Sequence, residues 1–149
     1  MGDAYELALQ ALSRKERTEA ELEGWLRERG VEEDELAEAM ARLAEAGAVD
    51  DERFARCFAE DKRELRGWGP ERIGEALRGR GVSEALVEAV LTAESPEESV
   101  ARAARLLAES GAEAGDEDSR GRALSLLARR GYPLEVAYEA VRRLERVTE

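Results

Sequence analysis

Apolar residues recur at helical spacing along almost the whole chain. The first clear example is the set Leu22, Trp25 and Leu26, which share one face of a helix. Thr18 stands just before this set and Glu21 follows three residues later, the arrangement of a capping box at a helix start. No segment shows the alternation of apolar and polar residues that marks strands between hairpin turns. The pattern therefore predicts an all-α protein.

One helix ending occurs three times. Each copy has a leucine, a glycine four residues later, an arginine just before that glycine and an apolar residue just after it. The copies are Leu26, Gly30 and Val31; Leu77, Gly81 and Val82; and Leu127, Gly131 and Tyr132. In a Schellman cap the glycine takes a left-handed conformation and the apolar residue packs back on the leucine. The three glycines lie 51 and then 50 residues apart, which is a repeat signal.

The apolar pattern also repeats beyond each glycine. The positions six and ten residues on are Leu36 and Met40, Val87 and Leu91, and Ala137 and Val141. Thirteen residues on stand Leu43 and Leu144, but Glu94 breaks the pattern in the middle copy. We expect three tandem three-helix repeats, over residues 1–49, 50–94 and 95–149. Each repeat is too small to bury a good core alone, so stacking would produce an elongated molecule.

The middle repeat carries two further structural signals. Asp50 and Asp51 place carboxylates at the positive end of a helix dipole, and this helix continues through Phe54. The second signal is the run Gly67, Trp68, Gly69 and Pro70. Its two glycines permit a sharp corner, and its proline suits the first turn of the next helix.

Charge narrows the choice of partners. The formal net charge is −12, and 14 of the 35 acidic residues but only 6 of the 23 basic ones fall within residues 1–50. Such a chain should not bind free nucleic acid through bulk charge, although local basic faces remain possible. We find no signal peptide and no stretch long enough to span a membrane, and we expect a cytoplasmic monomer.

The residues that usually perform catalysis are scarce. The chain has no histidine, which removes the commonest general base and the commonest metal ligand. Cys57 is expected to be a small buried hydrophobic residue on the apolar side of its helix. Asp50 and Asp51 could be a carboxylate pair for acid–base chemistry, but no nucleophile accompanies them, so a helix start is the better interpretation. We predict no enzyme activity, no cofactor and no metal.

Several residues are candidates for binding a partner. Arg53, Arg56 and Arg63 share one side of a helix, which is either a solvated face with ion pairs or a contact surface for phosphate or an acidic partner. A second basic cluster with the same two interpretations contains Arg120, Arg122, Arg129, Arg130, Arg142, Arg143 and Arg146. Trp68 is either a core anchor or an exposed partner contact. Asp50 and Asp51 complete the candidate set.

With these units laid out, the chain resembles the RecX family of regulators of the RecA recombinase. In the first repeat the resemblance rests on Ala11, Leu12, Ser13, Arg17, Glu21, Leu22, Leu26 and Gly30. In the second it rests on the run from Val49 to Ala55, on Gly67, Trp68, Gly69 and Pro70, and on Ile73, Leu77 and Gly81. The aspartate pair followed by Arg-Phe-Ala, together with the Gly-Trp-Gly-Pro corner, is a specific combination.

The resemblance implies three tandem three-helix repeats in a curved, elongated molecule. It also implies a protein that binds in the groove of the RecA–DNA filament and spans neighbouring protomers. Such a protein would inhibit strand exchange, ATP hydrolysis and cleavage of the SOS repressor. Many relatives are basic or near neutral and contact DNA, whereas a net charge of −12 favours weak or indirect DNA contact.

Two other functions remain open. The helix pairs around Gly30 and Gly81 have the lengths of a helix-turn-helix DNA-binding module, but the helix after Gly30 is rich in glutamate rather than in base-reading residues. A general scaffold could also use helical repeats to hold an unrelated partner. Tight, sequence-selective binding to duplex DNA would favour the first of these functions, and failure to retain the recombinase from an extract would favour the second.

Overall fold

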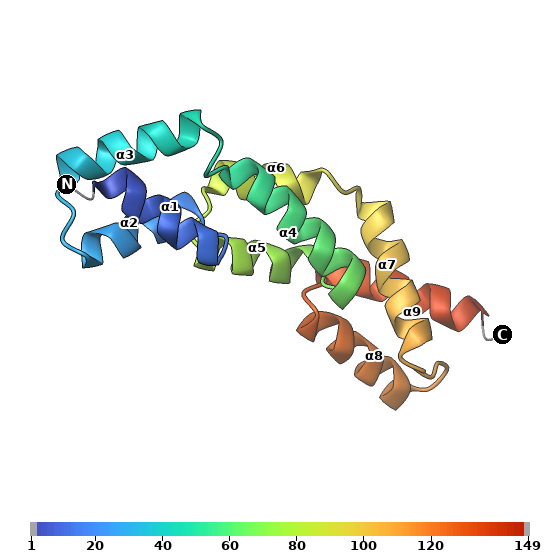
Figure 1. The fold of residues 1–149 in the computed structure, drawn as a ribbon. Helices are drawn as coiled ribbons and strands as arrows, with labels where there is room; N and C mark the ends of the chain where they lie inside the picture. The colour runs from blue at the N-terminus through green and yellow to red at the C-terminus, as the bar shows by residue number, and fades with distance from the viewer. Residues whose placement is uncertain (1–2, 148–149) are drawn as a thin grey trace. The chain divides into compact units, whose positions relative to one another are not determined.

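The computed structural model describes residues 3–147, and over this range all regular secondary structure is helical (Figure 1). The helices are α1 (Ala4–Arg14), α2 (Glu19–Glu28), α3 (Glu33–Glu45), α4 (Asp51–Arg66), α5 (Pro70–Gly79), α6 (Glu84–Thr92), α7 (Pro96–Glu109), α8 (Glu117–Arg129) and α9 (Leu134–Val147). The predicted all-α class is therefore confirmed.

The chain forms two compact units. Unit 1 comprises Met1–Arg56 and Leu77–Val87, and unit 2 comprises Cys57–Ala76 and Glu88–Glu149. The boundary passes through α4, α5 and α6, so both units draw on the middle helices. The three-repeat boundaries predicted from the sequence differ from this division and stay a prediction.

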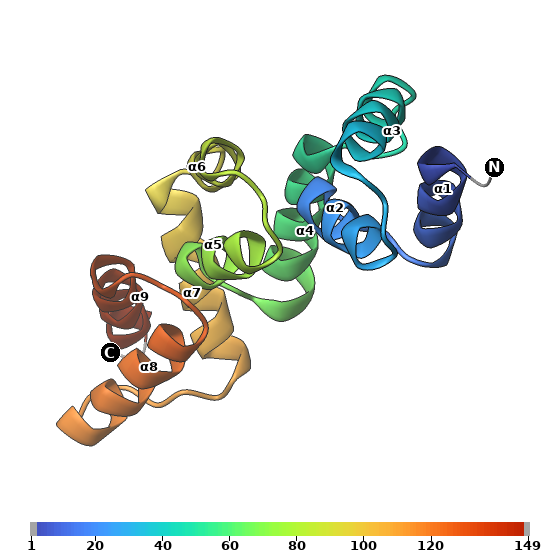
Figure 2. The same cartoon turned by 90° about the vertical axis from the view of Figure 1, so that its left-hand side faces the viewer.

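In unit 1, α1, α2 and α3 pack on one another in pairs (Figure 2). Their small core contains the periodic residues expected from the sequence, with Leu22, Leu26 and Leu43 fully buried. Small residues of α1, among them Ala8 and Ala11, let the helices approach closely. The apolar stripes of the three helices thus meet in one cluster.

Unit 2 has a second core, in which α9 packs on both α7 and α8. Leu107, Leu127 and Val141 are buried at its centre beside Tyr132. Ser95 begins α7 with a complete capping box, in which its hydroxyl accepts the Glu98 N–H. This box fixes where the third group of helices starts.

The three predicted Schellman caps are all present. Gly30, Gly81 and Gly131 have φ values of 82°, 83° and 94°. In each case the N–H of the following apolar residue donates to the carbonyl of the leucine five residues before it, at 3.2, 3.1 and 3.0 Å. These bonds satisfy carbonyls that a helix end otherwise leaves without a partner.

The second of these caps docks on the start of α2 inside unit 1. The Thr18 hydroxyl, fully buried, donates to the Arg80 carbonyl at 2.6 Å. The Arg80 guanidinium binds the Glu21 carboxylate through two bonds of 2.9 Å. A Cβ built at Gly81 would lie 2.5 Å from the Cβ of Ala20, so only glycine fits against α2 here. We call this contact the unit 1 joint.

The third cap docks on the start of α5 inside unit 2. The Gly69 N–H donates to the Arg130 carbonyl at 2.7 Å, and the Glu71 N–H donates to the Gly131 carbonyl at 2.9 Å. A Cβ built at Gly131 would lie 2.5 Å from the backbone nitrogen of Arg72. We call this contact the unit 2 joint, and these two bonds join main chain to main chain.

Candidate partner-binding surface

The eight residues predicted to bind a partner divide between the two units. Unit 1 holds Asp50, Asp51, Arg53 and Arg56, and unit 2 holds Arg63, Trp68, Arg129 and Arg130. The two sets differ in what their side chains do. The first set caps helices and lies at the surface, while most of the second set is engaged in packing and hydrogen bonds.

The aspartate pair is occupied by backbone donors. Asp50 Oδ1 accepts the Arg53 N–H at 3.0 Å and so caps the first turn of α4. Asp51 Oδ1 accepts the Glu19 N–H at 2.9 Å, one of the donors that the start of α2 leaves without a partner inside the helix. Burial and the nearby Asp51 carboxylate raise the pKa of Glu19 above its ordinary value. The pair thus has the structural arrangement expected of a helix start.

The first two arginines of α4 remain accessible. Arg53 approaches Asp50 at 3.9 Å while half of its side chain stays exposed, and Arg56 is exposed as well. An ion pair of this kind contributes about 0–1 kcal/mol, so an incoming anion can replace it at little cost. These two guanidiniums are the part of the predicted arginine face that a partner can reach.

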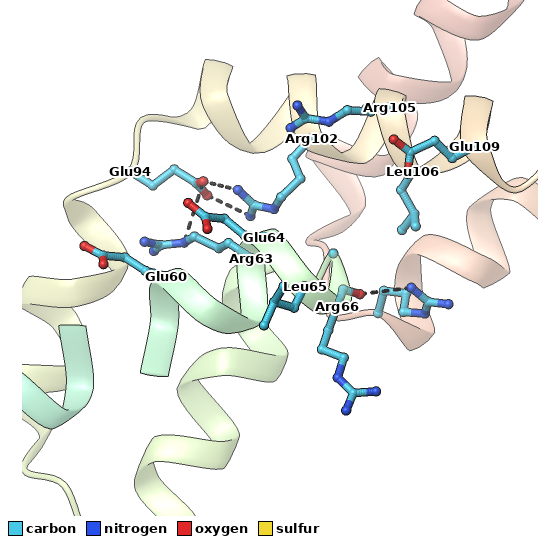
Figure 3. Close-up of a pocket in the computed structure, with 12 residues that line it drawn as sticks. Glu60, Arg63, Glu64, Leu65, Arg66, Glu94, Arg102, Arg105, Leu106 and Glu109 are labelled. Atoms are coloured by element: carbon cyan, nitrogen blue, oxygen red, sulfur yellow. Dashed lines mark hydrogen bonds and ion pairs between the residues drawn. The ribbon is translucent and has the colours of Figure 1, made fainter. Parts of the chain in front are cut away.

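The third arginine, Arg63, belongs to a buried ion network (Figure 3). Its Nη2 donates to the Val90 carbonyl at 3.1 Å, and its Nε lies 3.6 Å from Glu94. Glu94 also binds the guanidinium of Arg102 through both carboxylate oxygens. The side chains of Arg102 and Glu94 are only 8% and 10% exposed, so their charges depend on each other.

Tyr132 extends this network to the unit 2 joint. Arg102 Nε donates to the Tyr132 hydroxyl at 3.1 Å, and that hydroxyl donates to the Gly67 carbonyl at 2.7 Å. Burial raises the pKa of Tyr132, so the phenol stays protonated and keeps its donor. Glu94, Arg102 and Tyr132 were absent from the predicted site. The sequence signal for Glu94 was its polar side chain at a position that is leucine in the other two copies.

A pocket of about 630 Å³ opens beside the network in unit 2. Its charged lining consists of Arg63, Arg66, Arg102, Arg105 and Arg130 together with Glu60, Glu64, Glu94 and Glu109. Leu65, 77% exposed, and Leu106 supply an apolar part. In Figure 3 the guanidinium of Arg66 points away from the pair of Glu94 and Arg102. The pocket brings two predicted residues, Arg63 and Arg130, to one surface.

Trp68 lies half-buried in an aromatic and cationic cluster. Its ring meets Phe58 edge-on, with centroids 6.3 Å apart. Lys62 Nζ lies 4.8 Å and the Arg72 guanidinium carbon 4.3 Å from the Trp68 ring centroid. Such contacts contribute roughly 0.5–2 kcal/mol each. Trp68 therefore anchors the corner while part of its ring stays accessible.

The two arginines at the end of α8 take part in the unit 2 joint. The Arg129 carbonyl accepts from Arg72 Nη1 at 3.3 Å, and Arg130 Nη1 donates to the Arg66 carbonyl at 3.1 Å. Arg72 thus links Trp68 to Arg129. Neither Arg129 nor Arg130 has an ion pair with a carboxylate among the described residues, so both retain uncompensated charge.

The remaining basic cluster is largely neutralised. Its paired arginines are Arg120 with Glu145, Arg142 and Arg146 with Glu139, and Arg143 with Glu97 and Glu139. Arg122 instead donates to the Ser119 hydroxyl at 3.3 Å. The described arginines of unit 2 that form no ion pair with a carboxylate therefore lie outside α9: they are Arg66, Arg72, Arg105, Arg122, Arg129 and Arg130.

The start of α3 presents the opposite charge. Glu32, Glu33, Asp34 and Glu35 are all exposed. Only Glu33 binds a cation within the described chain, Arg27, at 2.8 Å. Three adjacent carboxylates thus face solvent in unit 1.

The described residues contain no group of three or more side chains able to hold a metal ion. Cys57 is exposed, so the prediction of a buried cysteine was wrong. The buried stripe of α4 runs through Phe54, Ala55 and Ala59, and the helical period places Cys57 on the other side. Between residues 3 and 147, no helix combines the length and the hydropathy that crossing a membrane requires.

Two models of the RecX family match this chain. The first three-helix domain of RecX matches residues 4–43, and the second matches residues 50–91. A crystal structure of RecX from Lactobacillus salivarius superposes with a TM-score of 0.85 over 95% of this chain and 94% of that chain, at 22% identity. A crystal structure of regulatory protein RecX superposes with a TM-score of 0.77 over 94% of this chain and 70% of that chain, at 23% identity. These structures share the fold.

Relatives of known name cover nearly the whole chain. A regulatory protein RecX of Thermus thermophilus is 36% identical over 140 residues, which is 94% of this chain and 91% of that protein. The Mycolicibacterium smegmatis protein of the same name is 32% identical over 93% of this chain and 77% of that protein. The Deinococcus radiodurans protein of that name is 38% identical over 91% of this chain and 65% of that protein. The chain belongs to the RecX family of regulatory proteins.

Proposed function

We propose that this protein binds in the groove of the RecA–DNA filament and inhibits strand exchange, ATP hydrolysis and cleavage of the SOS repressor. The single observation that carries the proposal is the similarity to proteins named regulatory protein RecX, which extends over more than nine-tenths of the chain. The two matched three-helix domains support it, and the second of them includes the predicted residues Asp50, Arg53 and Trp68.

The distribution of charge suggests how the two units contribute. The three unpaired carboxylates at the start of α3 suit a basic protein surface, because opposite potentials steer association and fix its register. The uncompensated arginines of unit 2 suit a phosphate backbone or an acidic segment of the partner. We propose that unit 1 contacts recombinase protein and that the arginines of unit 2 lie nearer to phosphate.

The decisive experiment measures RecA ATPase and strand exchange on single-stranded DNA, with and without this protein. We expect both activities to fall as the protein is added. The proposal fails if both rates stay unchanged at a concentration in excess over the recombinase. Gel shifts with naked duplex supply the contrast, since tight and sequence-selective binding would instead favour a helix-turn-helix DNA-binding protein.

A triple variant tests the role of the acidic surface. E32Q/D34N/E35Q removes the three unpaired charges and leaves Glu33 bound to Arg27. We expect at least a fivefold loss of inhibitory potency at low salt, and a smaller loss at high salt because salt screens exposed charges. The matched control is E71Q/E75Q/E88Q, which removes the same charge from exposed positions on α5 and α6. Equal potency of the two triple variants would show that only net charge matters.

A further inference from the structure

The two joints use equivalent positions of the repeat. Thr18 and Gly69 each stand immediately before the middle helix of their group, 51 residues apart. Each donates a hydrogen bond to the carbonyl of the arginine that precedes a cap glycine, Arg80 at 2.6 Å and Arg130 at 2.7 Å. In both joints the cap turn at the end of one helix therefore packs on the start of another helix through the same kind of contact.

The first copy of the cap turn has no such neighbour. Arg29, Gly30 and Val31 stand at the positions of the two docked turns. A Cβ built at Gly30 would meet nothing within 4 Å, whereas the same atom at Gly81 or Gly131 would overlap the docked helix. The Arg29 carbonyl accepts no hydrogen bond from the described residues. The second and third cap turns each contact the start of a helix. The equivalent surface of the first cap turn is uncovered.

The Arg29 side chain is held beside the open turn. Its guanidinium carbon lies 3.6 Å from the Trp25 ring centroid, and its Nη1 donates to the Trp25 carbonyl at 3.4 Å. No carboxylate of the described chain forms an ion pair with it. In the unit 1 joint the equivalent arginine, Arg80, lies over Phe54 and binds the Glu21 carboxylate. Arg29 thus has the aromatic support of its counterpart without the acidic partner.

We propose that the turn of Arg29, Gly30 and Val31 is a docking edge for the first turn of a helix in the partner protein. The incoming helix begins with serine, threonine or glycine, whose hydroxyl or backbone N–H donates to the Arg29 carbonyl. The third residue after that one is glutamate or aspartate, and its carboxylate binds the Arg29 guanidinium as Glu21 binds Arg80. Gly30 is required because any side chain would push that helix away. This inference rests on the proposed function, which makes the partner the recombinase filament.

Within a second copy of this chain, α8 is the equivalent middle helix, and its start does not match the two docked ones. In the two docked helices the residue before the helix lies 12 positions ahead of the cap glycine, as in Thr18 to Gly30. In α8 this interval is 15, from Asp116 to Gly131. With α8 placed as α2 and α5 are, its additional turn at Glu117 and Asp118 would occupy the position of a docked cap turn. The start of α8 therefore does not fit this edge in the register of the two joints, and we take the occupant to be a helix of the partner protein.

The test compares binding of variants to RecA filaments on single-stranded DNA. Gly30→Asn adds a side chain that tolerates the left-handed conformation, and Gly111→Asn is its matched control with φ of 74° and equally open surroundings. Arg29→Glu is paired with Arg14→Glu, the same charge change at an exposed position of unit 1. Circular dichroism and sedimentation confirm that each variant is folded and unassociated.

We expect Gly30→Asn and Arg29→Glu each to weaken filament binding at least tenfold, with both controls within twofold of the unaltered protein. Equal binding by Gly30→Asn and Gly111→Asn overturns the docking edge while leaving the proposed function intact. Absence of binding by the unaltered protein overturns the proposed function and the inference with it. Concentration-dependent oligomers that Gly30→Asn abolishes would identify a second copy as the occupant and would also overturn the inference.

Discussion

The unit 1 joint and the unit 2 joint place the same turn on the same part of a helix with different chemistry. In unit 1 side chains make the contact, through the Thr18 hydroxyl and the ion pair of Arg80 with Glu21. In unit 2 the backbone N–H groups of Gly69 and Glu71 make the closest bonds, and the side chains of Arg72 and Arg130 add bonds to backbone carbonyls. The geometry of the repeat is therefore kept while the atoms that hold it change.

The difference predicts unequal tolerance to substitution. The Arg80 and Glu21 side chains are about a third exposed, so water can replace part of what a mutation removes. At the unit 2 joint the glycines approach backbone, which cannot move aside without disturbing α5. Unit 2 also has the buried network of Glu94, Arg102 and Tyr132 behind its joint. We expect the unit 2 joint to be the more rigid of the two.

The largest expected effect comes from Gly131→Ala. Its Cβ would overlap the backbone nitrogen of Arg72, and its φ of 94° disfavours any Cβ. Steric overlap and conformational strain together should lower the free energy of unfolding by about 4 kcal/mol, measured by urea denaturation. Gly111→Ala has similar strain in open space, so its loss should be only about 1 kcal/mol. Equal losses would mean that the close approach to α5 contributes nothing.

The equivalent substitution in the unit 1 joint should lower stability by less, and a second substitution should restore part of the loss. A Cβ at Gly81 overlaps only the methyl group of Ala20, so Gly81→Ala should cost about 2 kcal/mol. Ala20→Gly removes the overlapping methyl, and the double variant should show a favourable coupling of about 1 kcal/mol. Additive losses would indicate that strain at Gly81, rather than contact with α2, determines the cost.

The effect of Glu94→Gln in unit 2 should lie between those of Gly131→Ala and Gly81→Ala. It leaves Arg102 buried without a counter-charge and weakens the support of Arg63. We expect a loss of about 3 kcal/mol in the free energy of unfolding, because removing one member of a buried ion pair leaves the other uncompensated. The control Glu84→Gln removes the charge of the exposed pair with Arg78 and should cost far less, because exposed ion pairs contribute little to stability. A loss as small as that of the control would show that water reaches Arg102.

Periodicity and cap chemistry were sufficient to predict the all-α class, the start of α2 after Thr18 and the three cap turns. Thr18 with Glu21 forms a capping box because both residues are close in sequence, and the caps at Gly30, Gly81 and Gly131 are equally local. Such features depend on residues within one turn of each other, so the chain alone specifies them.

The contacts between distant segments could not be predicted in this way. Nothing near Arg63 in sequence indicates that it meets Glu94 rather than solvent, and Cys57 was placed on the wrong face of α4. The docking of Gly131 on α5 joins residues about 60 positions apart, so it depends on how helices pack. Glu94 was the one useful signal, because a carboxylate at an otherwise apolar repeat position requires a buried partner.

The smallest expected effect is a difference in how stability depends on pH when either of two carboxylates in the first turn of α2 is removed. The hydrogen bond from Arg80 holds the pKa of Glu21 below its ordinary value, whereas burial and the nearby Asp51 raise the pKa of Glu19. A lowered folded-state pKa stabilises the protein above the unfolded pKa, and this stability is lost as pH falls through the folded value. A raised pKa of a carboxyl has the opposite sign, since the folded state then gains stability as the group is protonated.

Glu21→Gln keeps the acceptor for the Thr18 N–H and removes only the charge. It should cost about 1 kcal/mol at pH 7, and the cost should shrink as pH falls from about 5 to about 3. Relative to the unaltered protein, the stability of Glu19→Gln should instead decline over that interval, because the unaltered protein gains stability there by protonating Glu19. Urea denaturation of both variants at several pH values measures the two slopes. Because both residues lie in one helical turn, effects of the helix dipole are common to both variants. Slopes of the same sign would mean that the unit 1 joint does not depend on the charge of Glu21.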